Sequence, residues 1–288
     1  MKMDFHKETL KSILNELDRK NECTANYFKP VPPITPSRKE VISIIKIIQS
    51  VMFPEYFVLS ENEGKDRVEI LDTAFLTLKR QITAAYAASG SEMSKDTETL
   101  AYEILSLIPS IKEKLIKDIQ AIYEGDPAAN SPEEIILSYP GFYAISIYRL
   151  AHEFYVRKIP LIPRLMTEFA HEKTGIDIHA GATIGEYFCI DHGTGIVVGE
   201  TATIGNRVKL YQGVTLGAKS FELDENGNPV KGIKRHPDIG NNCIIYAGAT
   251  ILGGNTRIGD GTVIGGNVWL THSVGEGKVV YYGRENEK

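Results

Sequence analysis

The stretch from residue 177 to 217, "DIHAGATIGEYFCIDHGTGIVVGETATIGNRVKLYQGVTLG", places an aliphatic residue at nearly every sixth position, and this period decides the fold. A period of six is typical of a parallel β-helix, in which each six-residue unit forms one flat face of a coil and points its aliphatic residue inward. Stacked coils then bury a continuous aliphatic column. The aliphatic positions of this stretch are Ile178, Ile184, Ile190, Val198, Ile204, Leu210 and Leu216.

The period is interrupted between Ile190 and Val198, where the step is eight residues instead of six. The pair Asp191-His192 lies in this longer step. Two additional residues open a turn of the coil and push side chains outward, and we expect His192 to be one of them. A histidine is suitable as a general base because its ordinary pKa is near 6.5. We therefore interpret the longer step as a functional feature; a surface histidine at a turn is the alternative.

The six-residue period returns after a long interruption at residues 218–235, "AKSFELDENGNPVKGIKR". Asn226-Gly227 and Asn228-Pro229 are turn signals, so we expect this loop to project from a corner of the coil as a hairpin. It is either a functional excursion or a tolerated surface insertion. The aliphatic positions of the second repeat are Ile239, Ile245, Ile251 or Leu252, Ile258, Ile264 and Leu270.

The N-terminal part of the chain has a different period, because its apolar residues recur at helical spacing. Segment 37–53, "SRKEVISIIKIIQSVMF", is an example, with Ser37 as a candidate N-cap. The sequence therefore predicts an α + β protein, in which an all-helical domain precedes a parallel β-helix of hexapeptide repeats. The predicted division is a helical domain at 1–172 with an extension of unknown role at 1–90, a β-helix at 173–275 that includes the loop, and a C-terminal tail at 276–288.

Composition excludes several classes of function. The chain has 288 residues and a formal net charge of -5, which argues against a nucleic-acid partner because phosphate binding needs a basic surface. No stretch approaches the ~20 apolar residues of a membrane span, and the charged start of the chain is unlike a secretory signal. The three cysteines are far apart and form no CxxC motif, as in proteins with reduced thiols. We therefore expect a cytoplasmic protein with neither a membrane nor a nucleic-acid partner.

Motifs across residues 177–255 resemble those of the serine acetyltransferases, a family of hexapeptide-repeat acyltransferases. They are "DIHAGATIG", "IDHGTGIVVGETATIG", "VTLG", "KRHPDIG" and "YAGATILGG". A weaker match, "GDPAANSPEEIILSYPGFYAISIYRLAH", lies in the helical part. The resemblance implies a left-handed β-helix and trimers that share active sites between subunits, often paired into hexamers. It also implies transfer of the acetyl group of acetyl-CoA to L-serine, which gives the O-acetyl-L-serine used to make cysteine.

The resemblance assigns the proton transfer to His192 as the catalytic base, with Asp177 as its orienting partner and Asp191 on the substrate ammonium. The chemistry suits these residue types. The serine hydroxyl must lose its proton as it attacks the thioester, and a carboxylate on the other imidazole nitrogen fixes the tautomer. Asp177 and His192 are fifteen residues apart. This separation is not far from the eighteen residues of a complete coil, which makes neighbouring positions plausible.

The resemblance assigns the rest of the serine site to other segments. Arg235 is expected to bind the serine carboxylate together with His236, because a guanidinium fork suits bidentate recognition. Asp126, in "GDPAA", reaches from the helical domain to the amino group, and Glu200, in "VGETA", supports the site. A salt bridge at the loop base and a helix N-cap are the alternatives for Arg235-His236 and for Asp126.

Acetyl-CoA is the expected co-substrate, and no tightly bound cofactor is expected. Acetyl-CoA needs an extended groove along adjacent coils, where small side chains allow close approach. Lys219 is a candidate partner for the CoA phosphates, although a solvated loop explains it equally well. The residues that the resemblance assigns to acetyl-CoA are Gly217, Ala218, Lys219, Ala247 and Gly266.

Other functions are compatible with the same coil. His179, His192 and His236 would form a three-histidine zinc site across a trimer if the protein were a zinc-dependent hydratase of the β-helix carbonic anhydrase type. Another hexapeptide-repeat O-acetyltransferase and a non-catalytic trimeric scaffold are further alternatives. The adjacent acidic residues and the "RHP" context favour serine acetylation, for which no metal is expected.

Two partners besides the substrates follow from the resemblance. L-Cysteine is expected to be a feedback inhibitor, since it carries the same ammonium and carboxylate as L-serine. Many serine acetyltransferases insert a C-terminal isoleucine into cysteine synthase. This sequence ends in Lys288, and burying an unpaired ammonium in an apolar pocket costs several kcal/mol. We therefore expect no tight complex of that type.

Overall fold

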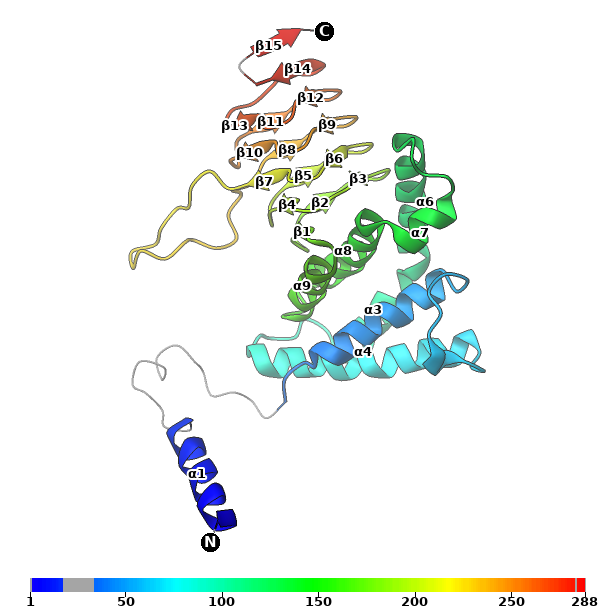
Figure 1. The fold of residues 1–288 in the computed structure, drawn as a ribbon, viewed down its shortest axis with the longest axis vertical. Helices are drawn as coiled ribbons and strands as arrows, with labels where there is room; N and C mark the ends of the chain where they lie inside the picture. Colours follow the sequence, from blue (N-terminus) through cyan, green and yellow to red (C-terminus); the bar gives the residue numbers. More distant parts are fainter. Residues whose placement is uncertain (1, 18–33, 283, 288) are drawn as a thin grey trace.

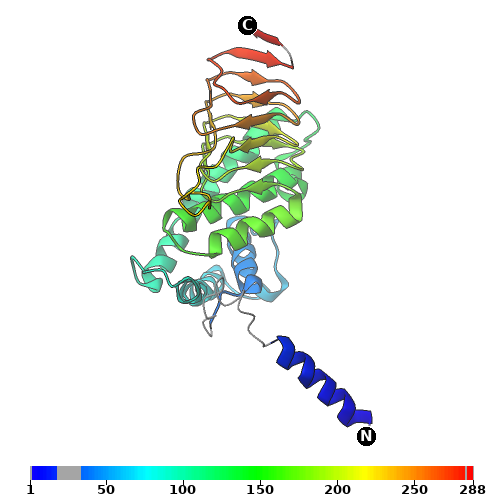
Figure 2. The same cartoon turned by 90° about the vertical axis from the view of Figure 1, so that its left-hand side faces the viewer.

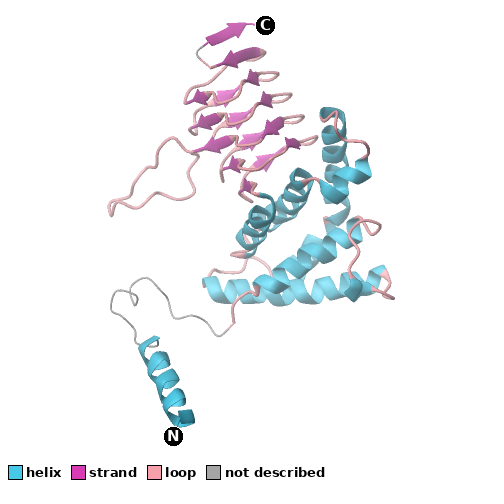
Figure 3. Cartoon of the chain, in the orientation of Figure 1, coloured by secondary structure: helices cyan, strands magenta, loops and turns pink. Residues whose placement is uncertain are grey.

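The computed structural model describes residues 2–17, 34–282 and 284–287, and it consists of a helical region followed by a β-helix (Figure 1, Figure 3). This architecture confirms the predicted fold class. No helix within the described ranges is long and apolar enough to cross a membrane. The prediction that concerns Lys288 lies outside the described residues.

The helices begin and end at residues whose chemistry favours those boundaries. Ser37 accepts a hydrogen bond from the amide of Glu40, as its sequence position predicts. Asp66 and Glu69 form a capping box at the start of α4, and Gly90 ends this helix in the left-handed conformation. The helices are α1 (Lys2–Leu17), α3 (Arg38–Met52), η1 (Ser60–Asn62), α4 (Arg67–Ser89), α5 (Thr97–Ser106), α6 (Ile108–Gly125), α7 (Pro132–Ser138), α8 (Pro140–Val156) and α9 (Ile162–Thr174).

Short strands of successive coils pair in parallel and form the three faces of the β-helix. The first face has the order β1-β4-β7-β10-β13, the second β2-β5-β8-β11 and the third β3-β6-β9-β12-β14, which β15 extends in the antiparallel direction. The strands are β1 (Asp177–Ile178), β2 (Thr183–Ile184), β3 (Cys189–Asp191), β4 (Val197–Val198), β5 (Thr203–Ile204), β6 (Lys209–Tyr211), β7 (Thr215–Gly217), β8 (Asp238–Ile239), β9 (Ile244–Ile245), β10 (Thr250–Leu252), β11 (Arg257–Ile258), β12 (Val263–Ile264), β13 (Trp269–Leu270), β14 (Lys278–Tyr281) and β15 (Arg284–Glu287).

The inside of the β-helix is the aliphatic column that the six-residue period predicts. Ile190, Leu210 and Ile245 stack in register on the third face, and all three are buried. Where the sequence leaves a choice between Ile251 and Leu252, Ile251 is the residue that is fully buried. The column is continuous with the core of the helical region, so the coils and the helices share one hydrophobic cluster.

The chain leaves this column at residues 218–235, which project from the side of the stack (Figure 1, Figure 2). Leu223 and Pro229 form an antiparallel bridge, and the amide of Asp224 donates to the carbonyl of Asn228 at 2.8 Å. The predicted hairpin is therefore confirmed.

The predicted limit of the β-helix at residue 275 is wrong, because the strands of the β-helix continue beyond it. Val279 and Val280 of β14 are buried and pair in parallel with β12, so the third face continues to Tyr281. The step from Leu270 to the inward residue Val274 is four residues. This short step hides the six-residue period in the last coil.

A buried ion pair joins the helical region to the first coil. Asp118 of α6 accepts hydrogen bonds from Arg149 of α8, including one from Nη2 at 2.8 Å. Arg149 also donates to the carbonyl of Gly185 at 2.8 Å, and Asp118 accepts from the amide of Phe188 at 2.9 Å. Because each charged group has several hydrogen-bond partners, these bonds offset the free-energy cost of removing the two charges from water. It fixes α6, and thereby the position of Asp126 directly after that helix.

Candidate active site

The longer step in the sequence forms an enlarged corner between the third and the first face. Asp191 is aligned with Tyr211 of the next coil, and Gly195 stacks on Gly213. Between these aligned positions the first coil has His192, Gly193 and Thr194, whereas the next coil has Gln212 alone. The corner therefore contains two additional residues, as the eight-residue step predicts.

The backbone of this corner turns the histidine outward. His192 and Gly193 have φ angles of 56° and 92°, respectively. A side chain at Gly193 would bring its Cβ to 2.5 Å from Cδ1 of Ile176, so only glycine fits there. The side chain of His192 is 75% exposed in the single chain. A neighbouring molecule or a substrate can therefore reach the imidazole.

Beside His192 lies a carboxylate that is itself paired with a lysine. The distance from His192 Nε2 to Asp191 Oδ1 is 3.7 Å, and Lys209 Nζ is 2.7 Å from Asp191 Oδ2. Lys209 also donates to the carbonyl of Gly125 at 2.7 Å and lies 4.5 Å from the ring centroid of Tyr211. Burial alone would lower the pKa of Lys209, but the hydrogen bond to Asp191 raises it above its ordinary value.

The helical region contributes Asp126 to the same corner. Asp126 Oδ1 accepts the amide of Ala128 at 2.9 Å, and Oδ2 accepts the hydroxyl of Tyr139 at 2.8 Å. The amide of Ala128 is the main cause that lowers the pKa of Asp126, and the nearby charges of Lys209 and His192 lower it further. Burial and Asp126 raise the pKa of Tyr139 to about 12. We call this corner, with Asp126, Asp191 and His192, the histidine edge.

A second group of polar residues lies at another corner, between the first and the second face. Arg235, where the projecting loop returns to the coil, donates from Nη2 to Glu200 Oε2. Tyr155 of α8 donates its hydroxyl to Glu200 Oε1 at 2.8 Å. Although burial raises the pKa of Glu200, the hydrogen bonds from Tyr155 and Arg235 lower it below its ordinary value. We call this corner, with Glu200, Arg235 and His236, the arginine edge.

His236 at the arginine edge is a neutral, buried imidazole. Its side chain packs beside Gly199, where a Cβ would lie 2.0 Å from His236 Cδ2. The amide of Thr201 donates to Nδ1 at 3.0 Å, so the ring proton belongs on Nε2. Burial, followed by the charge of Arg235, lowers the pKa of His236 to about 4.

His179 also lies at the arginine edge, and the amide of Gly181 donates to its Nδ1 at 3.0 Å. Its ring packs edge-to-face against Tyr155. Of the three histidines in the zinc alternative, His179 and His236 thus share one edge, whereas His192 lies at the other. In the described part of one chain, no group of three or more potential ligands could hold a metal ion. A three-histidine site would therefore require neighbouring chains.

Asp177 lies in β1 on the first face, where it pairs in register with Val197. Among the interactions of the described residues, no hydrogen bond or ion pair joins Asp177 to His192. The role of Asp177 as the orienting partner stays a prediction. In this conformation the carboxylate beside the His192 imidazole is that of Asp191.

The five residues assigned to acetyl-CoA divide between the two edges. Ala247 and Gly266 stack on the coils that follow the histidine corner, and a Cβ at Gly266 would lie 3.2 Å from the carbonyl oxygen of Ala247. Gly217, Ala218 and Lys219 lie at the arginine edge, where the projecting loop begins. A molecule that contacts both sets must reach two different corners, either of one β-helix or of two neighbouring ones.

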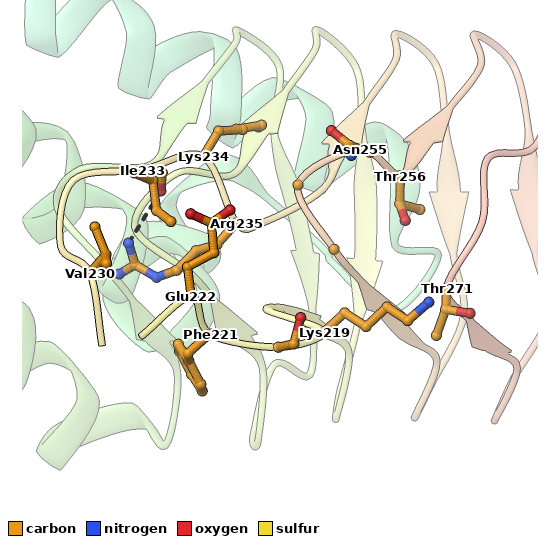
Figure 4. A pocket seen from close by; sticks show the side chains of 13 residues that line it. Lys219, Phe221, Glu222, Val230, Ile233, Lys234, Arg235, Asn255, Thr256 and Thr271 are labelled. Carbon is orange, nitrogen blue, oxygen red and sulfur yellow. Dashed lines mark hydrogen bonds between the residues drawn. The ribbon is translucent and has the colours of Figure 1, made fainter. Parts of the chain in front are cut away.

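A pocket of about 260 Å³ lies at the base of the projecting loop. Figure 4 shows the side chain of Lys219 extending toward Thr271, with Arg235 on the other side of the pocket beside Ile233. The coil backbone at Gly254 lies very close to the returning end of the loop, because a Cβ at this residue would lie 2.6 Å from the carbonyl oxygen of Lys234. The pocket adjoins the arginine edge, and its lining combines three cationic side chains and the carboxylate of Glu222 with polar and apolar residues.

Sequence reasoning did not single out Lys209, Tyr139, Tyr155 or Thr201. Lys209 had a usable signal, because it follows Cys189 by the twenty residues of the enlarged first coil and is aligned with it. On a strand, residues two apart share a face, so Lys209 belongs to the same outward face as Asp191. The contact of Tyr155 with Glu200 depends on how α8 docks on the coils, and that of Tyr139 with Asp126 on how the helices pack together, which no local pattern indicates.

Comparisons with known proteins point to one family. A family model described as "Serine acetyltransferase, N-terminal" matches residues 73–146. A curated plasmid serine acetyltransferase of Synechococcus elongatus is 43% identical over 270 residues, which cover 89% of this chain and 83% of that protein. The serine acetyltransferase of Bacillus subtilis is 46% identical over 160 residues, 56% of this chain and 69% of that protein. The crystal structure of serine acetyltransferase 1 of Entamoeba histolytica in complex with L-cysteine matches with a TM-score of 0.72 at 36% identity, over 86% of this chain and 87% of that one.

Proposed function

The chain belongs to the serine acetyltransferase family of acyltransferases, and from this premise we propose that it forms O-acetyl-L-serine and CoA from L-serine and acetyl-CoA. The reaction would supply an activated serine for cysteine biosynthesis. The observation that supports this proposal most strongly is the exposed imidazole of His192 at the enlarged corner of the first coil, beside the carboxylate of Asp191 and within the electrostatic influence of Asp126. A cytoplasmic location stays a prediction from the sequence.

At the histidine edge, Asp126 and Asp191 would bind the ammonium of L-serine and bring its hydroxyl to His192. The imidazole takes the hydroxyl proton as the serine oxygen attacks the thioester carbon of acetyl-CoA. The tetrahedral intermediate then collapses, the carbon–sulfur bond breaks, and the imidazolium returns the proton to the CoA sulfur. General-base assistance of this kind contributes roughly 10²–10⁴-fold. Asp177 would orient the imidazole in the reacting conformation.

At the arginine edge, Arg235 would bind the serine carboxylate. Its guanidinium uses Nη2 on Glu200, which leaves other N–H groups of the fork for a substrate. His236 would donate from Nε2, because Nδ1 accepts the amide of Thr201. Glu200 holds Arg235 in place and thereby supports the site.

One serine molecule must contact both edges, yet the edges lie at different corners of one chain. We therefore infer that the histidine edge of one subunit faces the arginine edge of its neighbour in a trimer, alone or as a dimer of trimers. Cyclic symmetry gives each trimer three such sites. Acetyl-CoA would lie in the groove between subunits, with Ala247 and Gly266 on one wall and Gly217 and Ala218 on the other. Lys219, in the pocket of Figure 4, would meet a CoA phosphate.

L-Cysteine would compete with L-serine, since it offers the same ammonium and carboxylate to the two edges. The Entamoeba histolytica relative was crystallised in complex with L-cysteine. In a steady-state assay, L-cysteine should raise the apparent KM for L-serine without changing kcat at saturating L-serine. An unchanged KM would contradict a shared pocket.

Release of CoA from acetyl-CoA in the presence of L-serine tests the proposed function directly. Reactions with L-threonine in place of L-serine, and with water as the sole acceptor, are the controls. The zinc-hydratase and scaffold alternatives predict no release of CoA that depends on L-serine. We expect rapid release that depends on L-serine and is lost in His192→Ala. Release that is independent of L-serine, or that persists in this variant, would contradict the proposal.

A further inference from the structure

Lys209 is a charged group at the histidine edge that the proposed reaction does not use. It is 15% exposed, and its ammonium joins three elements: Asp191 Oδ2 at 2.7 Å, the carbonyl oxygen of Gly125 at the end of α6, also at 2.7 Å, and the ring of Tyr211. Asp191 is 13% exposed, so both members of the ion pair are largely removed from water. A lysine with these contacts is held in place and is not a solvated surface charge.

The charges at this edge show why the lysine matters. Asp126 and Asp191 carry two negative charges, whereas serine brings one ammonium. Lys209 compensates one of these two charges, so Asp126, Asp191 and Lys209 together carry one negative unit, which a single ammonium neutralises. Without Lys209, two uncompensated carboxylates would face His192 and stabilise its protonated form, which cannot act as a base.

We propose that Lys209 is a positioning residue that holds Asp191 and the end of α6 together and keeps the imidazole of His192 uncharged when the enzyme binds serine. This inference rests on the proposed function, because it concerns the same base. It adds an electrostatic role for a residue that touches neither serine nor acetyl-CoA.

The groups that face His192 come from several elements. Asp191 precedes it in β3, Lys209 lies in β6, Asp126 follows α6, and Tyr139 precedes α8. The hydroxyl of Tyr139 is neutral near pH 7, since burial and Asp126 raise its pKa to about 12. Lys209 is therefore the cation among these groups, and its removal changes the field at the imidazole by a full unit of charge.

The sign of the expected effect follows from this field. Loss of a nearby positive charge favours the protonated imidazole over the neutral one, so the base should become active only at a higher pH. The acidic limb of the kcat/KM profile, which reports groups of the free enzyme, should then move to higher pH. A unit charge at a partly solvated site shifts a neighbouring pKa by about one unit. At a pH below the limb, kcat/KM should fall by about tenfold.

The test compares Lys209→Met with Lys209→Arg in pH profiles of kcat/KM for L-serine. The methionine variant keeps most of the side-chain length but removes the charge, and we expect its acidic limb to move up by about one pH unit. The arginine variant keeps the charge, and its limb should stay at the wild-type pH. If Lys209→Met does not fold, Lys209→Gln replaces it, because glutamine keeps an N–H donor for Asp191 without the charge.

Lys117→Met is the matched control. Lys117 also joins α6 to the β-helix, through Glu186 at 3.0 Å, but it lies away from His192. Its loss should leave the acidic limb unchanged. Identical limbs in wild type, Lys209→Met and Lys209→Arg would overturn the inference, and so would equal shifts in both Lys209 variants, which would indicate a purely structural role. Wild-type protein without serine-dependent CoA release would instead overturn the proposed function.

Discussion

The histidine edge and the arginine edge are corners of the same β-helix, but they are built in opposite ways. At the histidine edge the imidazole of His192 is 75% exposed, and the carboxylate of Asp191 lies beside it. At the arginine edge the imidazole of His236 is buried and packed against Gly199, where no side chain fits. Under the proposed function, the exposed imidazole of His192 would accept the proton, and the arginine edge would bind the substrate carboxylate.

This difference shows how reactive side chains can be placed on a repetitive scaffold. A regular coil buries one residue in each repeat and leaves a smooth surface, so reactive groups need a departure from the repeat. The two-residue enlargement supplies such a departure at one edge, and the projecting loop supplies it at the other. Neither edge contains all the groups that serine acetylation needs. Under the proposed function, the complete site would therefore depend on how copies of the chain assemble.

The largest effect should follow from removal of the base at the histidine edge. We expect His192→Ala to reduce kcat by roughly 10²-fold or more, because general-base assistance is lost. Since the imidazole is exposed, the thermal midpoint should stay close to that of the wild type. Steady-state CoA release and a thermal melt check both points. Near-wild-type turnover would show that another group takes the proton.

A smaller effect should follow from a change in the carboxylate receptor at the arginine edge. Arg235→Lys keeps the charge but removes the planar fork, and we expect the KM for L-serine to rise about tenfold with a minor change in kcat. Arg257→Lys, at a side chain that is 79% exposed, is the control and should match the wild type. A loss confined to kcat in Arg235→Lys would mean that the guanidinium acts on the transition state instead of on the bound serine.

The last effect concerns stability instead of activity and distinguishes the two histidines. The pKa of His236 is about 4 in the folded chain, compared with about 6.5 when unfolded. Its contribution is complete above pH 6.5 and is lost as the pH falls toward 4, because only the unfolded chain takes up the proton in that range. We expect a loss of about 2 kcal/mol per chain from this group.

Urea unfolding at pH 7 and pH 4.5 measures this loss. The wild type should lose more stability between the two pH values than His236→Gln, which has no imidazole to protonate. His192→Gln, at the exposed histidine, should lose as much as the wild type. Equal losses in all three proteins would show that His236 is not held neutral by its burial.

Sequence patterns predicted the inward column and the enlarged corner because both follow from counting residues. A six-residue step must bury its aliphatic residue, and an eight-residue step must open a turn, as at His192. The contact of Lys209 with the carbonyl of Gly125 depends instead on the docking of α6 against the β-helix. Long-range packing sets that docking. The limit of the β-helix at residue 275 was wrong for a related reason, since the four-residue step before Val274 has no signature in the period.

The central claim, that each site combines the histidine edge of one subunit with the arginine edge of its neighbour, is tested most directly by mixing two inactive variants. His192→Ala and the double variant Arg235→Met/His236→Gln would be co-expressed with different tags, purified through both tags and assayed for serine-dependent CoA release. In a cyclic trimer that carries both tags, one of the three sites, or roughly a third, would combine two intact edges. The account therefore predicts that about a third of wild-type activity returns in the doubly purified trimers. Activity no higher than the sum of the two separate variants would contradict it.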